Sequence, residues 1–262
     1  MPSILDQLIF MTRYFVEVSY LGTAYHGWQR QPTLTQTVQH VLEEKLSILL
    51  RDQVAIVASG RTDAGVHCRS QVFHMDCKPL ADLARFRFQL NKFLPPDIAI
   101  HRIAEVPSTA HARFDALRRS YLYQMHYGKD VFSPGLSYQL RREVDIDAAN
   151  QAATQLLGRH NFYNTSKTKT DVATYFCEIF ACYWTQEGTK VSFHIVGNRF
   201  LRGMVRIVVG NLLRVGLGEV KPEKIALLIE PADTHAKEAK RHLVPAHGLY
   251  LNGVQYPSYL GW

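Results

Sequence analysis

Long apolar runs, closely spaced cysteines and glycine-rich phosphate loops are all missing from this sequence. No segment approaches the roughly 20 consecutive apolar residues that a membrane-spanning helix needs. The apolar start, MPSILDQLIF, has no preceding positive charge and is interrupted by Asp6, so we expect neither a signal peptide nor a membrane span there. No cofactor-binding motif is recognisable, so the sequence predicts no cofactor, and the lack of an apolar span predicts no membrane partner.

The few cysteines form no recognisable metal or disulfide framework. No pair has the two-residue spacing of a zinc knuckle, and the number is low for a disulfide scaffold. Two histidines lie near the first pair, but on the strand predicted over residues 69–77 His74 and Cys77 would point to opposite faces. We therefore expect reduced, buried thiols in a cytoplasmic protein, and no metal site. The cysteines are Cys68, Cys77, Cys177 and Cys182.

The charge balance is basic. Lys and Arg number 30 against 23 Asp and Glu, which gives a net charge of +7 and a sequence pI near 9.2. Such a surplus favours a polyanionic partner, because each neutralised phosphate releases condensed counterions. The plainer alternative is that many globular proteins are mildly basic without binding nucleic acid. The content of 47% hydrophobic and 20% charged residues is typical of a folded soluble protein.

The first half of the chain predicts the order β-α-β-β-α-β. Alternating side chains indicate the strands, a broad apolar face indicates the first helix, and the pair Pro95-Pro96 must end the second helix. The expected elements are a strand at 13–20, a helix at 35–50, strands at 54–58 and 69–77, a helix at 80–94 and a strand at 98–106.

The second half predicts a similar order. On its first strand Tyr121, Tyr123 and Met125 would share one face. Gly158 would end its first helix, and a shorter helix would begin at Pro222. The expected elements are a strand at 119–127, a helix at 147–157, strands at 176–184 and 190–196, a helix at 200–215 and a strand at 248–255.

These patterns predict an α+β fold of two ferredoxin-like β-α-β-β-α-β halves in a pseudo-repeat. The sheets would pack on helices, with a positively charged cleft between the halves. We expect an N-terminal extension at residues 1–12, an N-terminal half at 13–107 and a C-terminal half at 108–262. Met11 offers an alternative start of translation. No flexible linker divides the halves, which are expected to share a core.

The stretch SGRTDAGVH, residues 59–67, is the most unusual segment. A short strand precedes it, and Ala64-Gly65 allow a tight turn that would lift the Asp63 carboxylate out of the end of a sheet. A carboxylate there can act as a nucleophile, because it is ionised at neutral pH and Arg61 lies close by in the chain. The plainer interpretation is that Asp63 caps the turn and that Arg61 is a solvated charge.

SGRTDAGVH resembles the active-site motif of the TruA-type tRNA pseudouridine synthases, and four further segments resemble this family in matching order. RYFVEVSYLGTAYHGWQRQP is similar to the family's first strand and its Tyr-x-Gly-Trp-Gln loop, and RSYLY to the segment with the substrate-stacking tyrosine. NRFLRGMVRIVVGNLLRVGLG is similar to the long C-terminal helix, and VPAHGLYLNGVQYP to the closing segment. The resemblance runs from about Tyr14 to Pro257.

The resemblance implies an isomerase that converts uridine to pseudouridine without a cofactor. The substrate would be tRNA, modified on the 3′ side of the anticodon stem–loop at tRNA positions 38–40. The resemblance also implies a homodimer in which one tRNA spans both subunits.

Roles for five residues follow from the same resemblance. Asp63 would be the nucleophile, and Arg206 would pair with it and keep it ionised. Tyr121 would stack on the target uracil, Arg61 would hold the displaced nucleotide or its phosphate, and Leu249 would form an apolar floor. The plainer alternatives are core packing for Tyr121 and Leu249 and a solvated charge for Arg61.

Other basic residues are candidates for contact with the RNA backbone, although each is as easily a solvated surface charge. These candidates are Arg69, Arg85, Arg87, Arg113, Arg118, Arg119, Arg141 and Arg142. Two segments depart from the family pattern. In HNFYNTSKTKTDVATYF, Lys167 and Lys169 keep the basic character, and in FLRGMVR the pair Arg202-Gly203 stands where aromatic or histidine residues are common.

Two other functions fit parts of the sequence. A hydrolase or transferase could use Asp63 on a small substrate, but it would leave the basic surplus and the aromatic strand unexplained. An inactive RNA-binding protein could keep the same scaffold, but Asp63 stands in an unbroken motif. The isomerase is therefore the favoured interpretation.

Overall fold

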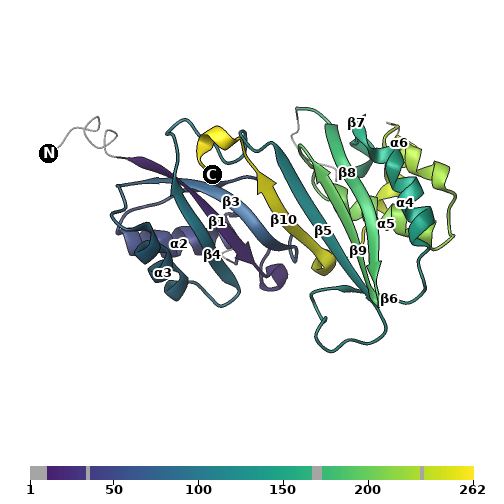
Figure 1. The fold of residues 1–262 in the computed structure, drawn as a ribbon, viewed down its shortest axis with the longest axis horizontal. Coiled ribbons are helices and arrows are strands. Elements are labelled where there is room, and N and C mark those ends of the chain that lie inside the picture. The colour runs from purple at the N-terminus through teal and green to yellow at the C-terminus, as the bar shows by residue number, and fades with distance from the viewer. Residues whose placement is uncertain (1–10, 34–35, 167–172, 231–232) are drawn as a thin grey trace. The chain divides into compact units, whose positions relative to one another are not determined.

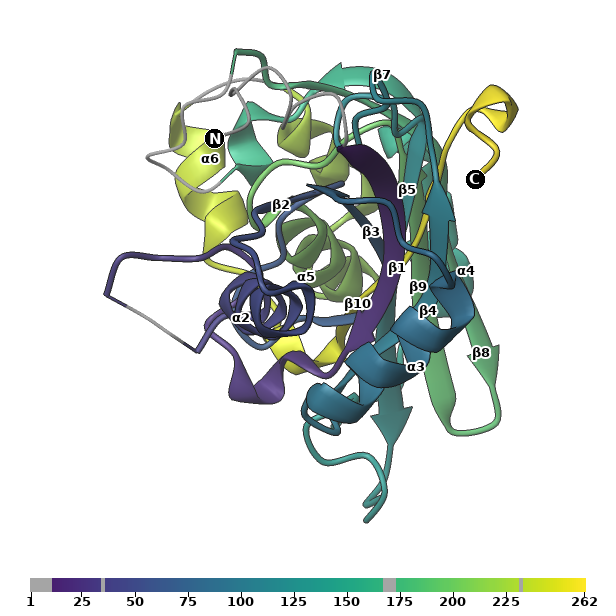
Figure 2. The same cartoon turned by 90° about the vertical axis from the view of Figure 1, so that its left-hand side faces the viewer.

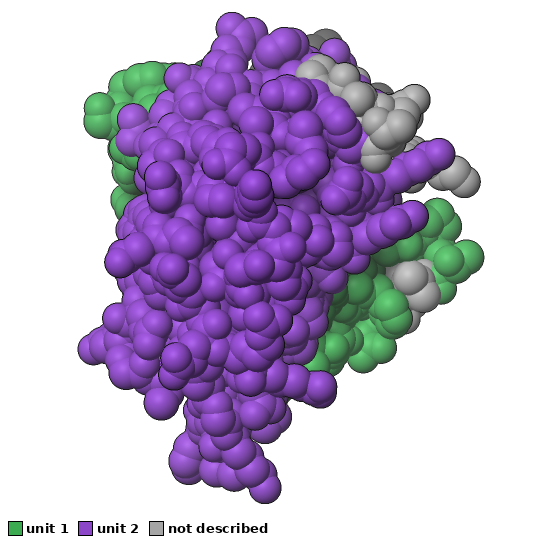
Figure 3. All heavy atoms as spheres, turned by 90° about the vertical axis from the view of Figure 1, so that its right-hand side faces the viewer, with its two compact units in different colours: residues 1–117, 251–262 green, residues 118–250 purple. Residues whose placement is uncertain are grey.

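The computed structural model describes residues 11–33, 36–166, 173–230 and 233–262 (Figure 1). The expectations for residues 1–10 and for Lys167 and Lys169 lie outside these ranges. The chain forms two compact units, which Figure 3 distinguishes by colour. Unit 1 comprises the described part of residues 1–117 together with residues 251–262, and unit 2 comprises the described part of residues 118–250.

Unit 1 contains the strand and helix order that the sequence predicts for residues 13–106. Its elements are β1 (Thr12–Tyr20), α2 (Val38–Leu50), β2 (Ile56–Ala58), β3 (His67–Cys77), α3 (Leu83–Phe93), β4 (Ile98–Glu105) and most of β10 (Leu249–Gln255). Three strands lie in the order β4-β1-β3, and β2 pairs with β3; all of these pairs are antiparallel. β10 is a further neighbour of β3. The predicted α+β class is confirmed.

Side-chain caps begin both helices of unit 1. Thr37 accepts a hydrogen bond from the backbone N–H of His40 at the start of α2. Asp82 accepts one from the backbone N–H of Arg85 at the start of α3. α3 then ends shortly before Pro95, since the residue before a proline disfavours helical geometry. The two helices contact each other, as Figure 2 shows, and α3 also packs on β4.

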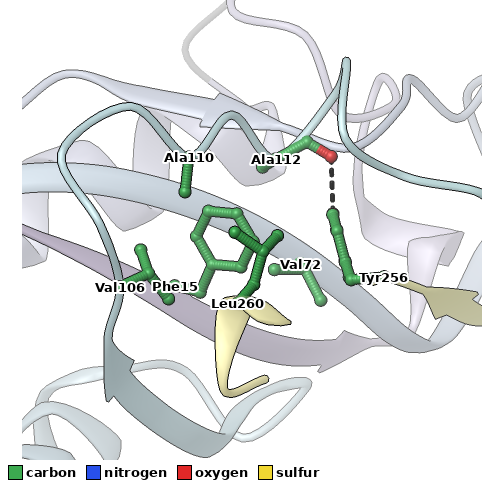
Figure 4. Packing of buried hydrophobic residues seen from close by; sticks show 7 residues of the cluster. All are labelled: Phe15, Val72, Val106, Ala110, Ala112, Tyr256 and Leu260. Carbon is green, nitrogen blue, oxygen red and sulfur yellow. Dashed lines mark hydrogen bonds between the residues drawn. The ribbon is translucent and has the colours of Figure 1, made fainter. Parts of the chain in front are cut away.

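Residues near the C-terminus complete the core of unit 1. Tyr256 and Leu260 lie in one buried cluster with Phe15 of β1 (Figure 4). The Tyr256 hydroxyl also donates a hydrogen bond of 2.5 Å to the backbone oxygen of Ala112. Burying a large apolar side chain contributes on the order of 2 kcal/mol, so the segment 251–262 is part of the stability of this unit.

A buried histidine gives unit 1 a predictable weakness in acid. His74 of β3 is 6% exposed, and its Nδ1 accepts the backbone N–H of Ala112 at 3.1 Å. Burial, reinforced by the positive charges of Arg13 and His111, lowers the pKa of His74 from 6.5 to about 4. As the pH falls below 6.5 the unfolded chain takes up the proton first, so stability present at neutral pH is lost on the way to pH 4.

We expect the free energy of unfolding to fall by up to about 3 kcal/mol from this group between pH 6.5 and 4. The measurement is urea unfolding at several pH values for the wild type and for His74→Asn. Asparagine keeps an acceptor near the position of Nδ1 but takes up no proton. The variant should therefore lose less stability on acidification than the wild type, and parallel pH profiles for the two proteins would contradict the prediction.

Unit 2 is a second sheet with its own helices. Its elements are β5 (Arg118–Tyr127), β6 (Tyr138–Leu140), α4 (Ile146–Ala153), β7 (Gly158–Asn161), β8 (Phe176–Glu187), β9 (Lys190–Gly197), α5 (Met204–Gly216) and α6 (Asp233–Lys240). The strand order is β5-β9-β8-β7, with antiparallel neighbours, and β6 pairs parallel to β5. Within the described ranges, no helix has the length and apolar character needed to cross a bilayer.

Hydrogen bonds fix α4 on this sheet. The Asn150 side chain accepts the backbone N–H of Trp184 at 2.7 Å and donates to its carbonyl at 3.1 Å, as a neighbouring strand would. α4 also contacts α5, whose residues are almost all buried. The expected short helix at Pro222 is a 3₁₀ helix ending at Leu228. The pseudo-repeat of the two halves stays a prediction.

Candidate active site

Asp63 lies on the connection between β2 and β3 in unit 1, here called the Asp63 loop (residues 59–66). These two strands pair antiparallel, so the loop spans the end of a hairpin. Asp63 is half-buried, Arg61 before it is exposed, and Thr62 between them is buried. Asp63 thus keeps partial exposure to solvent, while the residue before it is anchored in the unit.

Two hydrogen bonds fix the residue immediately before Asp63. The hydroxyls of Tyr20 and Thr62, both buried, lie 2.8 Å apart. The backbone N–H of Trp28 donates to the carbonyl of Thr62 at 3.2 Å. Since Thr62 is held through both its side chain and its backbone, little freedom remains at the position from which the Asp63 side chain projects.

The loop after β1 contacts the Asp63 loop at glycines. A Cβ placed on Gly27 would lie 2.7 Å from the carbonyl oxygen of Thr62 and 3.1 Å from the carbonyl carbon of Asp63. Gly27 also has a φ of +91°, which favours glycine. At Gly22 a Cβ would overlap the backbone of Val66. The Tyr-x-Gly-Trp-Gln element thus supports the Asp63 loop by backbone contact that a larger residue would prevent.

Two polar contacts, one buried and one partly buried, hold this supporting loop. The backbone N–H of Gly22 donates to Nδ1 of His67 at 3.0 Å, so the neutral ring carries its proton on Nε2. The Tyr25 hydroxyl donates to Asp97 at 2.7 Å, and the pKa of Tyr25 is raised, first by burial and then by Asp97. The sequence did not single out these roles, because they depend on partners far away in the chain.

In unit 2, Tyr121 and Tyr123 lie on one face of β5 but differ in burial. Tyr123 is fully buried, and its hydroxyl donates to the carbonyl of Pro245 at 2.9 Å. Tyr121 is half-buried, and its ring meets that of Phe200 edge-on with centroids 5.0 Å apart. Tyr123 is thus a core residue, whereas Tyr121 is only partly buried.

Arg206 lies in the first turn of α5. A cation is unfavourable there because the N-terminal end of a helix carries a partial positive charge. Its Nε donates to the carbonyl of Val244 at 2.8 Å, which sets the direction of the guanidinium. The fold therefore orients the Arg206 guanidinium, although a cation at this position does not stabilise the helix.

Leu249 is buried at the start of β10, after a segment that Arg206 and Tyr123 hold in place. Arg206 binds the carbonyl of Val244, and the Tyr123 ring lies against Gly248, where a Cβ would come within 2.7 Å of the ring. The closing segment that leads to Leu249 is thus fixed at both ends. The structure brings Arg206 and this segment together within unit 2.

The predicted site residues divide between the units. Arg61 and Asp63 belong to unit 1, and Tyr121, Arg206 and Leu249 belong to unit 2. Among the described residues, no group of three or more His, Cys, Asp or Glu side chains is placed to hold a metal ion. The four cysteines are buried and free, and the expectation of buried cysteine side chains is met.

Comparison with known proteins identifies the class of enzyme. A family model described as tRNA pseudouridine synthase matches residues 17–115 and 152–257. A tRNA pseudouridine synthase A of Parabacteroides distasonis is 43% identical over 95% of this chain and 98% of the relative. The enzyme of the same name from Bacillus subtilis is 35% identical over 92% of this chain and 98% of that relative. The chain therefore belongs to the tRNA pseudouridine synthase family, whose members are isomerases that act on uridine in tRNA.

Among solved structures, an H/ACA RNP bound to a substrate RNA containing 2′-deoxyuridine matches with a TM-score of 0.34. It is 14% identical over 76% of this chain and 44% of that chain. This similarity is too low to add to the assignment, which depends on the family model and on the full-length relatives.

Gly27→Ala should impair turnover through the contact with the Asp63 loop. The new methyl would force apart backbones that now touch, and a displacement of about 1 Å at a reacting group costs roughly 10²-fold in rate. We expect kcat on tRNA to fall by about that factor, with a smaller change in KM. The measurements are steady-state kinetics and urea unfolding.

The matched control is Gly128→Ala. Gly128 has a φ of +74°, but nothing lies within 4 Å of the position of its Cβ. It carries the same backbone strain without the clash, at a cost of about 1–2 kcal/mol in stability. If both variants lowered kcat equally, strain rather than contact with the Asp63 loop would be responsible.

Proposed function

We propose that this protein isomerises uridine to pseudouridine in the anticodon stem–loop of tRNAs, on the 3′ side at tRNA positions 38–40. The observation that carries this proposal is the half-buried Asp63 on a loop braced by Tyr20, Trp28 and Gly27. Family membership supports the reaction class and the tRNA substrate. The choice of tRNA positions rests on the motif resemblance.

The reaction breaks the N1–C1′ bond of uridine, turns the uracil and joins its C5 to C1′, releasing the C5 proton. No atom is gained or lost beyond exchange of that proton, and no redox change occurs. The Asp63 carboxylate acts by adding to the base, by attacking C1′ or by assisting departure of the base as a glycal forms. All three routes need an ionised carboxylate, which a nearby cation such as Arg206 would favour.

Access to the base requires that it leave the helical stack, at a cost of a few kcal/mol. Stacking on the partly exposed Tyr121 ring, worth roughly 1–3 kcal/mol, would offset much of that cost. Arg61, exposed beside the Asp63 loop, would hold the displaced nucleotide through a phosphate. Leu249 would provide the apolar floor beneath the uracil.

The test is tritium release from tRNA transcripts labelled at C5 of uridine, followed by mapping of pseudouridine along the tRNA. We expect release without added metal or cofactor, confined to positions 38–40. Release at other positions only would contradict the proposed specificity. Absence of release from every tRNA, with tRNA binding intact, would favour an inactive RNA-binding protein.

We further propose that the protein acts as a homodimer in the cytoplasm. Its buried, free cysteines agree with a reducing compartment. Sedimentation of the purified protein with and without tRNA tests the oligomeric state. A monomer in both measurements would contradict the dimer.

A further inference from the structure

The exposed face of α3 combines cations with aromatic rings. Arg85, Phe88 and Lys92 follow one another at spacings of three and four residues, so they lie along one side of the helix. All three side chains are exposed, and the Phe88 ring is 60% exposed. Phe93, at the end of the helix, is 49% exposed. We call Arg85, Phe88 and Lys92 the basic–aromatic face.

The helix itself carries no carboxylate that would balance the positive charge of this face. The helix sequence LARFRFQLNKF contains no Asp or Glu, and the Asp82 carboxylate before it is engaged in capping the backbone N–H of Arg85. Among the described residues, no ion pair joins Arg85 or Lys92 to a carboxylate. The Lys92 ammonium lies 4.6 Å from the centroid of the Phe88 ring, so one cation and one ring form a joint surface.

A helix that only keeps the protein dissolved would not need this composition. Surface helices usually mix both signs of charge and place polar side chains outward. Here the outward positions hold two cations and a phenyl ring, with a third cation, Arg87, bound to the carbonyl of His101 on β4. Cations beside an exposed ring fit a partner that carries phosphates and flat bases, which is single-stranded or looped RNA.

We propose that the basic–aromatic face of α3 is an auxiliary tRNA-binding surface, additional to the residues around Asp63. Arg85 and Lys92 bind backbone phosphates, and Phe88 stacks on an unpaired base. The charge complementarity selects RNA over a second copy of this basic protein, whose net charge of +7 would oppose association through a cationic face. The inference rests on the proposed function, because that function supplies the tRNA.

The test uses the full-length protein with Arg85→Ala and Lys92→Ala combined, and separately Phe88→Ala. Each lost phosphate contact should reduce the slope of log Kd against log salt concentration by about 1. The slope of the double variant should therefore be smaller than that of the wild type by about 2. Phe88→Ala should weaken tRNA binding about fivefold or more with an unchanged salt slope. In all variants KM should rise while kcat at saturating tRNA stays constant, because the contact is equal in ground and transition states.

The matched control is Lys221→Ala combined with Lys224→Ala, which removes two exposed cations beside Glu223 in unit 2. It should leave the salt slope nearer to the wild-type value than the α3 double variant does. Circular dichroism checks that α3 survives, as expected since alanine favours helix.

An unchanged Kd and salt slope in the α3 double variant would overturn the proposal. So would a change in oligomeric state with tRNA binding per subunit unaffected, because the face would then join two copies of the chain. If the wild type released no tritium but the double variant still bound tRNA more weakly and with a smaller salt slope, the proposed reaction would be wrong. The proposal of a tRNA-binding surface on α3 would then still hold. If the wild type were active and the α3 variants matched it in every measurement, this surface alone would fail.

Discussion

Replacing Asp63 with asparagine is expected to abolish tritium release from tRNA, lowering kcat by at least about 10⁴-fold. The amide has nearly the same shape as the carboxylate but carries no charge and is a poor nucleophile. The loop should keep its conformation, because Tyr20, Thr62 and Gly27 brace it independently of the charge at position 63. Binding of tRNA should stay within a few-fold of the wild type, since phosphate contacts supply most of the affinity.

The matched control for Asp63→Asn is Asp82→Asn. Asp82 is exposed in the same unit, and asparagine caps a helix about as well as aspartate, so the substitution removes one charge without loss of the cap. Its kcat should stay near that of the wild type. Substantial tritium release by Asp63→Asn and Asp63→Ala would remove this residue from the chemistry. Loss of tRNA binding in parallel with activity would instead indicate a role in binding.

Arg206→Gln is expected to lower kcat by about 10²- to 10³-fold, the usual effect of removing one preorganised charge from a reacting centre. The change in stability should be modest. One hydrogen bond to Val244 is lost, worth about 1 kcal/mol, while a cation unfavourable to the first turn of α5 is removed. Single-turnover tritium release at saturating tRNA measures the chemical step directly.

Two further variants separate charge from orientation at this position. Arg206→Lys keeps the charge but loses the planar group that donates to Val244, so an intermediate kcat is expected. Arg214→Gln makes the same exchange at the other end of α5, where Arg214 lies 3.6 Å from Glu219, and should leave kcat unchanged. Equal kcat for Arg206→Gln and the wild type would show that Asp63 needs no cation from α5.

Much of the fold follows from local signals along the chain. Alternation and helical periodicity predicted the elements of unit 1 to within a few residues, because strands and helices with one buried face leave a period in the sequence. β6 and β7 were missed, since three or four residues are too few to show a period. α6 was missed because its sequence, DTHAKEAK, has almost no apolar side chain.

The site was predictable only as far as its motifs reach. SGRTDAGVH and the resemblance together singled out Asp63, but the partners that hold its loop come from β1 and the loop after it. The hydroxyl contact between Tyr20 and Thr62 joins positions with no local relation in the sequence. The same is true of Arg206 and Val244, which lie 38 positions apart. Such contacts depend on tertiary packing, which leaves no local pattern.

The packing of Leu260 and Tyr256 against Phe15 has a consequence for biosynthesis. The unit that carries Asp63 contains both early and late parts of the chain, with all of residues 118–250 made in between. On the ribosome, β1 must therefore wait without its final apolar neighbours until nearly the whole protein has emerged. Such long-range closure slows folding, and it makes the nascent unit dependent on protection from aggregation until its last segment arrives.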